Sequence, residues 1–293
     1  MSDTWTGVSG KRVVITGATN GIGLAAAQQL AALGAELAIV ARSPQRATDA
    51  LTKIAAAAPR GTPPDVFIAD LSEQGDVRRV AAEIASRYRR LDVLINNAGA
   101  IFARRQLSRD GVELTWAVNH LAPFALTTTL LDKLKASAPA RVITTASGAH
   151  YRARIPFDDL TAERSYTGMG FGRYGETKLA NILFTAELAR RLEGTGVTAN
   201  CFHPGFVGTG FNHNNGPLMQ VAMWMGALFA RKPETGAETL VWLADSPDVS
   251  GISGGYFVDK RRVAPSSAAQ DMDQARRLWQ VSEDMLTVHV PRR

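Results

Sequence analysis

The stretch TGATNGIG, residues 16–23, joins the apolar run KRVVIT (11–16) to the Ala/Leu-rich run GIGLAAAQQLAALG (21–34). The first run is typical of a buried strand and the second of a helix, so the glycines lie at a strand-to-helix turn. Gly17 can make the tight turn, Gly21 can let the backbone approach a pyrophosphate, and Gly23 can let the helix pack closely. Glycines also mark plain tight turns, and the spacing differs from G-x-G-x-x-G. The position of the motif between strand and helix nevertheless favours dinucleotide binding at the helix N-terminus.

Short apolar runs and longer helical patterns alternate along the rest of the chain. Near-continuous apolar strands separated by helices predict a parallel sheet that is covered on both faces. No low-complexity linker interrupts the alternation, so we expect one domain over residues 1–293. The fold class is then α/β, a Rossmann fold with a doubly wound, mostly parallel, seven-stranded sheet whose last strand lies at an edge. The other expected strands are ELAIVA (36–41), DVFIAD (65–70), DVLINN (92–97), RVITTA (141–146), VTANCF (197–202) and GGYFV (254–258), and helical patterns cover about 42–58, 73–89, 110–136 and 174–193.

The composition of the 293 residues excludes several classes of protein. The net charge is +6, but the basic residues are scattered and the longest run is only residues 260–262, which argues against nucleic acid as a partner. The one cysteine, Cys201, lies in an apolar stretch and predicts core packing rather than a disulfide or a cysteine-rich metal site. The five histidines have no metal-ligand spacing. Because no secretion signal and no transmembrane segment is recognisable, we expect a cytoplasmic protein.

The end of the second strand bears on the choice of cofactor. An acid there would hold the ribose 2′-hydroxyl of NAD(H), but this strand ends Val40-Ala41-Arg42. Arg42 can instead bind a 2′-phosphate with its forked guanidinium, which favours NADP(H). The alternative is that Arg42 is a surface residue near a helix start.

The segment RYGETKLAN (173–181) sets Tyr174 and Lys178 four positions apart, on one helix face. A solvated helix face explains such a pair, because aromatic and basic residues are common there. The chemical explanation is that a fixed ammonium, together with the positive charge of an oxidised nicotinamide, favours the phenolate. Lowering a tyrosine pKa by three units needs roughly 4 kcal/mol, which clustered charges in a partly dry cleft can supply.

Three motifs together, NNAG (96–99), TTASGAH (144–150) and YGETK (174–178), resemble those of the short-chain dehydrogenase/reductase family. The resemblance covers nearly the whole chain. Within the family, the long segment between Ser147 and Tyr174 is similar to the retinol dehydrogenase-like branch, as are KLANILFTAELARRL (178–192), HPGFVGT (203–209) and ARRLW (275–279).

The resemblance implies a catalytic tetrad of Asn119, Ser147, Tyr174 and Lys178. Tyr174 is then the acid/base, Lys178 hydrogen-bonds the nicotinamide ribose, Ser147 binds the substrate oxygen, and Asn119 holds a water in a proton relay. Taken alone, Asn119 is an ordinary polar helix residue, and Thr144 and Thr145 are alternative hydroxyls to Ser147. The implied cofactor contacts are Gly17, Thr19, Asn20, Gly21, Ile22, Gly23, Arg42, Asp70, Leu71, Asn97, Ala98, Gly99, Tyr174, Lys178, Pro204, Gly205, Val207 and Thr209.

Two departures from the family limit the resemblance. Asn20 stands where NADP-preferring relatives often carry arginine, so the NADP(H) preference depends largely on Arg42. Many retinol dehydrogenase-like enzymes also carry an N-terminal membrane anchor that is not recognisable here.

On the substrate side, the segment PLMQVAMWMGALF (217–229) concentrates Met and aromatic residues after the Pro-Gly turn. It is explained equally well as core or as part of a substrate lid within about 206–232. A third interpretation is an interfacial membrane contact. Family members often dimerise through the helices that carry Asn119 and Tyr174, so a homodimer is a candidate assembly.

We therefore expect an NADP(H)-dependent oxidoreductase that interconverts a small apolar aldehyde or ketone and its alcohol, with no metal. Two alternatives remain at this stage. One is a non-catalytic NADP(H)-sensing or scaffold protein, and the other is a C=C reductase of the protochlorophyllide reductase-like type.

Overall fold

A computed structural model of the chain describes residues 5–59, 63–206 and 231–288, and within them one sheet has the strand order β3-β2-β1-β4-β5-β6-β7-β8. All neighbouring strands pair in parallel except β7 and β8, which are antiparallel. The strands are β1 (Arg12–Thr16), β2 (Glu36–Ala41), β3 (Asp65–Ile68), β4 (Val93–Asn96), β5 (Ala140–Thr145), β6 (Val197–His203), β7 (Tyr256–Val258) and β8 (Arg261–Arg262).

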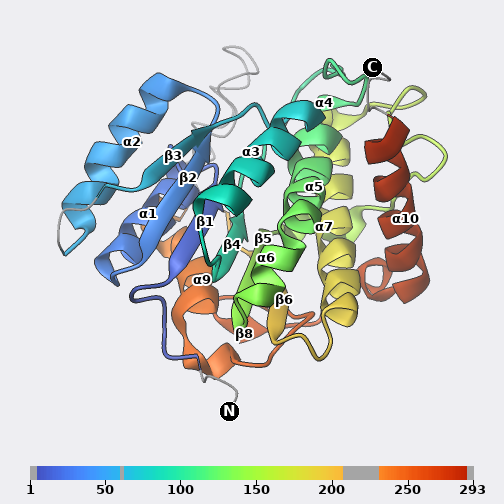
Figure 1. Cartoon of the computed structure of the whole chain (residues 1–293). Helices are drawn as coiled ribbons and strands as arrows, with labels where there is room; N and C mark the ends of the chain where they lie inside the picture. Colours follow the sequence, from blue (N-terminus) through green and yellow to red (C-terminus); the bar gives the residue numbers. More distant parts are fainter. Residues whose placement is uncertain (1–4, 60–62, 207–230, 289–293) are drawn as a thin grey trace.

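Helices cover both faces of this sheet, as expected (Figure 1). One face is covered by α1 (Gly21–Ala32), α2 (Pro44–Ala57) and α9 (Pro233–Asp245). The other is covered by α3 (Gln74–Arg87), α5 (Ala122–Thr129), α6 (Leu131–Ala136), α7 (Phe171–Arg191) and α10 (Met272–Val288). Short elements complete the path: α4 (Leu114–Trp116), the π-helix η1 (Ala117–Leu121), and the 3-10 turns η2 (Gly148–Arg152), η3 (Gly168–Gly170), η4 (Pro247–Val249) and η5 (Ser267–Gln270).

The apolar strands are buried because successive side chains point to opposite faces and each face has its own helical layer. Val13 and Ile15 of β1 pack with α1, α2 and α9, whereas Val14 between them packs with α3, α5 and α7. Cys201 is buried in β6, which confirms the expected core position.

Two expectations about the elements are wrong. The sheet has eight strands rather than seven, because Arg261 and Arg262 turn back along β7 and take the edge position expected for the seventh strand. The helical pattern over 110–136 is not one helix but α4, the π-helix, α5 and α6 in succession. Pro123 accounts for part of this break, since it has no N–H to donate to the carbonyl of Asn119 four residues earlier.

The strand order reverses its direction of growth between β1 and β4. In open α/β sheets, ligands bind outside the carboxyl ends of the strands at such a switch point. The glycine loop after β1 and the NNAG turn after β4 therefore meet there. In the described part of the chain, no helix is long and apolar enough to cross a bilayer.

Candidate active site

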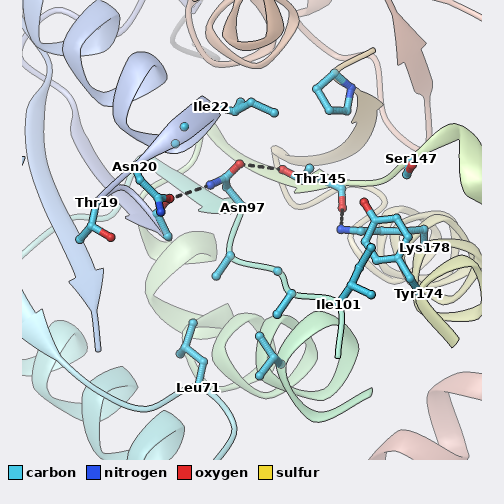
Figure 2. A pocket seen from close by; sticks show the side chains of 18 of the residues that line it. Thr19, Asn20, Ile22, Leu71, Asn97, Ile101, Thr145, Ser147, Tyr174 and Lys178 are labelled. Carbon is cyan, nitrogen blue, oxygen red and sulfur yellow. Dashed lines mark hydrogen bonds between the residues drawn. The ribbon is translucent and has the colours of Figure 1, made fainter. Parts of the chain in front are cut away.

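A cleft of about 870 Å³ lies at the carboxyl ends of the strands. Figure 2 shows Thr19 and Asn20 of the glycine loop on one side of it, and Ser147, Tyr174 and Lys178 on the other. The structure brings sixteen of the predicted cofactor contacts to the wall of this one cleft: Gly17, Thr19, Asn20, Gly21, Ile22, Gly23, Arg42, Asp70, Leu71, Asn97, Ala98, Gly99, Tyr174, Lys178, Pro204 and Gly205. Val207 and Thr209, and the segment 217–229, lie outside the described residues.

The glycine loop has the backbone geometry that its sequence predicts. Gly17 has φ +69°, and a Cβ there would lie 2.7 Å from the Cα of Ala98. At Gly23 a Cβ would lie 2.2 Å from the Gly17 carbonyl oxygen, so a side chain cannot enter either position. Helix α1 follows with no acidic residue in its first turn and no side-chain cap on its N-terminal N–H groups. This arrangement fits the diphosphate of a dinucleotide.

Asn97 holds the loop against the centre of the sheet. Its amide nitrogen donates to the carbonyl oxygens of Thr16 and Gly17, both at 3.2 Å. Its amide oxygen accepts from the Thr145 hydroxyl at 3.3 Å, a bond drawn in Figure 2. The NNAG motif therefore joins the carboxyl ends of β1, β4 and β5 at the wall of the cleft.

The cleft has two arginines where β2 passes into α2. Arg42 and Arg46 are both exposed cleft residues, and neither guanidinium forms an ion pair or hydrogen bond with a described residue. Ser43 caps α2, its hydroxyl accepting from the backbone N–H of Arg46 at 3.4 Å. Sequence reasoning missed Ser43 and Arg46. The signal for them is Ser43 followed by Pro44, a helix-start signature that places Arg46 in the first turn beside Arg42.

At the other end of the cleft, Tyr174 and Lys178 project from α7. The Nζ of Lys178 donates to the Thr145 carbonyl at 2.8 Å and lies 5.4 Å from the centre of the Tyr174 ring (Figure 2). The hydroxyl of Ser147, immediately beyond β5, forms a hydrogen bond with Tyr174 and accepts one from the Ala149 N–H at 3.2 Å. Lys178 is buried and Tyr174 is half-buried, so the pair belongs to the cleft wall and not to a solvated helix face.

The direction of the Tyr174 pKa differs from the sequence expectation. Burial raises the pKa of Tyr174 to about 12, and the bond with Ser147 offsets only part of that rise. Burial also lowers the pKa of Lys178 to about 7, so the lysine is a weaker positive charge than the sequence suggested. Desolvation, which the spacing of the two residues does not reveal, dominates both values.

Asn119 is the one predicted catalytic residue that does not line the cleft. It is fully buried in the π-helix, where its amide oxygen accepts from the Ala100 N–H at 2.7 Å. Its amide nitrogen donates to the Ala100 carbonyl at 2.9 Å and to the Thr177 hydroxyl at 3.1 Å. The side chain thus joins the segment that follows NNAG to the helix that carries Tyr174.

The part of the cleft beside Ser147 and Tyr174 is apolar. Phe171 and Phe206 are large exposed side chains on its rim, and Ile101 and Phe102 are buried in its wall. Sequence reasoning named none of these. The lining residues that it missed are Val40, Ala41, Ser43, Arg46, Ala69, Ala100, Ile101, Phe102, Val118, Gly148, Ala149, Phe171, His203 and Phe206. Thr145, which sequence reasoning named only as an alternative hydroxyl to Ser147, also lines the cleft. Within the described residues, no group of three or more His, Cys, Asp or Glu side chains is placed to hold a metal ion.

Comparisons with known proteins agree with this geometry. Residues 11–158 match the family model for short chain dehydrogenases. Mouse retinol dehydrogenase 14 is 41% identical over 294 residues, which cover 95% of this chain and 86% of that protein.

The chain belongs to the short-chain dehydrogenase family.

A second curated protein and a solved structure are also similar to this short-chain dehydrogenase. A Streptomyces protein with the provisional name daunorubicin C-13 ketoreductase is 38% identical over 276 residues, covering 94% of this chain and 92% of its own. A short chain dehydrogenase from Burkholderia cenocepacia, solved in complex with NADP, superposes with a TM-score of 0.67 at 27% identity. It covers 90% of this chain and 99% of its own. The chain is thus a retinol dehydrogenase-like short-chain dehydrogenase, an oxidoreductase with a nicotinamide cofactor site.

Proposed function

We propose that this protein is an NADP(H)-dependent oxidoreductase that interconverts a small apolar aldehyde or ketone and its alcohol. The observation that carries the proposal is the arrangement of one cleft. Ser147, Tyr174 and Lys178 lie together beside its apolar end (Figure 2). Arg42 and Arg46 lie at its other end, and neither has an ion-pair partner among the described residues. The relatives named as retinol dehydrogenases and as a ketoreductase support carbonyl and alcohol chemistry.

In the direction of reduction, Tyr174 protonates the carbonyl oxygen. A bound NADPH, held by the glycine loop, Asn97 and Lys178, would supply the hydride to the carbonyl carbon. The raised pKa of Tyr174, about 12, keeps the phenol protonated at neutral pH and ready to donate. The Ser147 hydroxyl donates a second hydrogen bond to the substrate oxygen as negative charge develops there.

The substrate is apolar because the wall beside Ser147 and Tyr174 is built from hydrocarbon. Ile101, Phe102, Phe171 and Phe206 offer aromatic and branched surface without a charged group. Such a wall binds a lipophilic molecule by excluding water and leaves the carbonyl to be oriented by the two hydroxyls.

Preference for NADP(H) is supported by the arginines at the start of α2. The second strand ends without an acid, and Arg42 and Arg46 have no carboxylate partner among the described residues. A 2′-phosphate would give both guanidiniums a charge-assisted partner, and Ser43 adds a hydroxyl.

The preference is tested by replacing one guanidinium. Arg42→Ala is expected to raise the KM for NADPH by about tenfold or more, since a hydrogen bond to a charged group contributes about 1.5–3 kcal/mol. The KM for NADH is expected to change little. Arg89→Ala, which removes the same charge from an exposed position beyond α3, is the control. Equal losses with both cofactors would contradict the proposed 2′-phosphate site.

The chemistry is tested by steady-state oxidation of NADPH with a panel of apolar aldehydes and ketones, followed by product analysis. Tyr174→Phe should reduce kcat by at least about a thousandfold, while NADPH still binds and quenches tryptophan fluorescence as in the wild type. Binding without turnover in the wild type would favour a sensor, and a saturated carbonyl product would favour a C=C reductase.

A further inference from the structure

His150 lies three residues after Ser147, in the 3-10 turn η2, and its side chain is fully buried. Its Nδ1 is 2.7 Å from the backbone carbonyl oxygen of Ser147. The backbone N–H of Ser266, more than a hundred residues later, donates to its Nε2 at 3.1 Å. The imidazole therefore connects the backbone of the proposed catalytic serine to the segment that leads into α10.

The two backbone partners determine the protonation state of this ring. The Ser266 N–H can only donate, so Nε2 must offer a lone pair. The Ser147 carbonyl can only accept, so Nδ1 must carry the proton. Only the neutral Nδ1–H tautomer makes both bonds. The Nε2–H tautomer loses both of them, and the doubly protonated ring loses the bond from Ser266. The ring centroids of Tyr151 and Tyr256 lie 4.1 Å and 5.1 Å from that of the His150 imidazole. His203 lies close to Gly148, where a Cβ would be 3.3 Å from its Nε2.

The position of the Ser147 hydroxyl depends on the same turn. Its oxygen accepts from the Ala149 N–H, which leaves its own proton for Tyr174 or for a substrate oxygen. The chain leaves the sheet at Ala146, whose N–H bonds the Phe202 carbonyl at 2.8 Å. Beyond that point, the partners of the Ser147 carbonyl among the described residues both come from the turn: the backbone N–H of His150 at 3.3 Å and its imidazole.

We propose that His150 is a positioning residue that, as the Nδ1–H tautomer, aims the Ser147 hydroxyl by holding the Ser147 carbonyl and anchoring the turn to Ser266. The inference rests on the proposed catalytic role of Ser147. A partner beyond the residue in contact with the substrate commonly sets the orientation of that residue, and a small misplacement of a reacting group costs a large factor in rate.

Ser266→Pro removes the anchor without changing the residue at position 150. Ser266 has φ −58°, which proline adopts, and its hydroxyl has no hydrogen-bond partner among the described residues. The substitution replaces the N–H that bonds Nε2 with the proline Cδ, so it removes the donor and displaces the imidazole from Ser266. We expect kcat to fall about tenfold or more with the dissociation constant for NADPH unchanged. Gln270→Ala is the matched control, because it releases the same segment from the Pro265 carbonyl without touching His150. It should leave kcat near the wild-type value.

A double-mutant cycle separates positioning from general destabilisation. In a Ser147→Ala background there is no hydroxyl to aim, so adding Ser266→Pro should lower the residual kcat by less than about twofold. An equal loss in both backgrounds would overturn the proposal, as would an unchanged kcat in Ser266→Pro alone.

The tautomer is tested without any assay of activity. In protein labelled with ¹⁵N-histidine, the signal that disappears in His150→Phe should report a neutral ring protonated at Nδ1 at pH 7. A ring protonated at Nε2, or at both nitrogens, would overturn the inference. If the wild type reduces no carbonyl while the Nδ1–H tautomer is present, the proposed function fails and the anchoring geometry stands. If Ser147→Ala is inactive but Ser266→Pro is fully active, the function stands and the inference fails.

Discussion

Lys178 is a buried charged group in a protein that gains nothing in stability from it. Its Nζ is enclosed, and burial lowers its pKa to about 7 from the usual 10.5. The Thr145 carbonyl that it contacts also accepts from the Asn181 amide at 3.3 Å, so the carbonyl keeps a partner without the lysine. Burial of the ammonium therefore costs stability, which supports the proposed role of Lys178 in the chemistry.

Lys178→Met should therefore stabilise the protein while it abolishes turnover. The unfolded chain binds the lysine proton more tightly than the folded one, so the cost of burial is fully present below pH 7 and disappears as the pH approaches 10.5. We expect the Tm at pH 6.5 to rise by about 5 °C, with a gain that shrinks toward pH 10. Thermal unfolding monitored by circular dichroism measures the Tm gain at pH 6.5 and its decrease toward pH 10. In the control Tyr174→Phe, the Tm change should not vary with pH between 6 and 9; a constant gain in Lys178→Met would contradict the buried charge.

The pH dependence of turnover follows from Tyr174. Reduction needs the protonated phenol, so kcat should be flat from pH 6 to 9, because the pKa is raised to about 12 by burial. Oxidation of the alcohol needs the phenolate and should accelerate with rising pH over the same range. Initial rates with NADPH and with NADP, corrected for cofactor stability, compare the two directions. A reduction rate that declines from pH 7 to 9 would contradict the assignment of Tyr174 as the acid.

At the scale of elements, the long segment before α7 is held by a buried ion pair. Glu113 and Arg173 are both buried, with the carboxylate 2.9 Å from Nε, and the guanidinium stacks on Trp116 at 4.6 Å. Arg173 also donates to the Leu160 carbonyl and to Glu176. Tyr166 donates to the Phe102 carbonyl at 2.6 Å. The apolar wall of the cleft is thus attached to the helix of Tyr174.

Glu113→Gln should lower the free energy of unfolding by about 3 kcal/mol. One oxygen of Glu113 accepts from Trp116 N–H and Arg173, and an amide nitrogen there would face two donors. Urea denaturation of the variant and the wild type measures this change in the free energy of unfolding. Glu163→Gln, which disturbs only an exposed pair with Arg105 at 3.8 Å, is the control and should change it by less than about 1 kcal/mol. Equal effects of the two substitutions would mean that the buried pair does not hold the segment.

The sequence predicts some of these elements well and others not at all. Strand β2 is found at the residues expected, and α7 begins only a few residues early, because apolar periodicity and the glycine loop act locally. The π-helix at Asn119 is invisible to periodicity, although Pro123 signals a break. The Glu113–Arg173 pair joins residues sixty positions apart, which no local pattern reveals. The same holds for the site. Local motifs predict the cofactor contacts that line the cleft, whereas the positions of Phe102 and Phe206 and the desolvation of Lys178 depend on tertiary packing.

At the scale of the whole molecule, α10 lies alongside α7, one of the helices expected to form a dimer (Figure 1). Trp279 of α10 packs on Phe124 of α5 and Phe184 of α7 with ring centroids at 4.9 Å and 5.8 Å. Arg191 lies over the same indole at 4.1 Å. Another protomer cannot use this surface while α10 occupies it.

We therefore expect that the protein does not dimerise through α5 and α7. Sedimentation equilibrium measures the assembly state, and hydrogen exchange at low and high protein concentration locates any interface. Concentration-dependent protection confined to α5 and α7 would contradict the expectation. Trp279→Ala should lower the free energy of unfolding by about 3–5 kcal/mol, since it removes a large side chain from this packed cluster.

The position of α10 also bears on how the protein is made. A ribosome releases the glycine loop, Ser147 and Tyr174 well before Ser266 and Trp279. Until those last segments emerge, the nascent chain lacks the donor for His150 and leaves Phe124 and Phe184 exposed. Domains generally begin to fold from the N-terminus during synthesis, and transiently exposed apolar surface invites aggregation. This site thus becomes complete only after Ser266 and Trp279 have been synthesised, and chains truncated before them are candidates for chaperone capture and proteolysis.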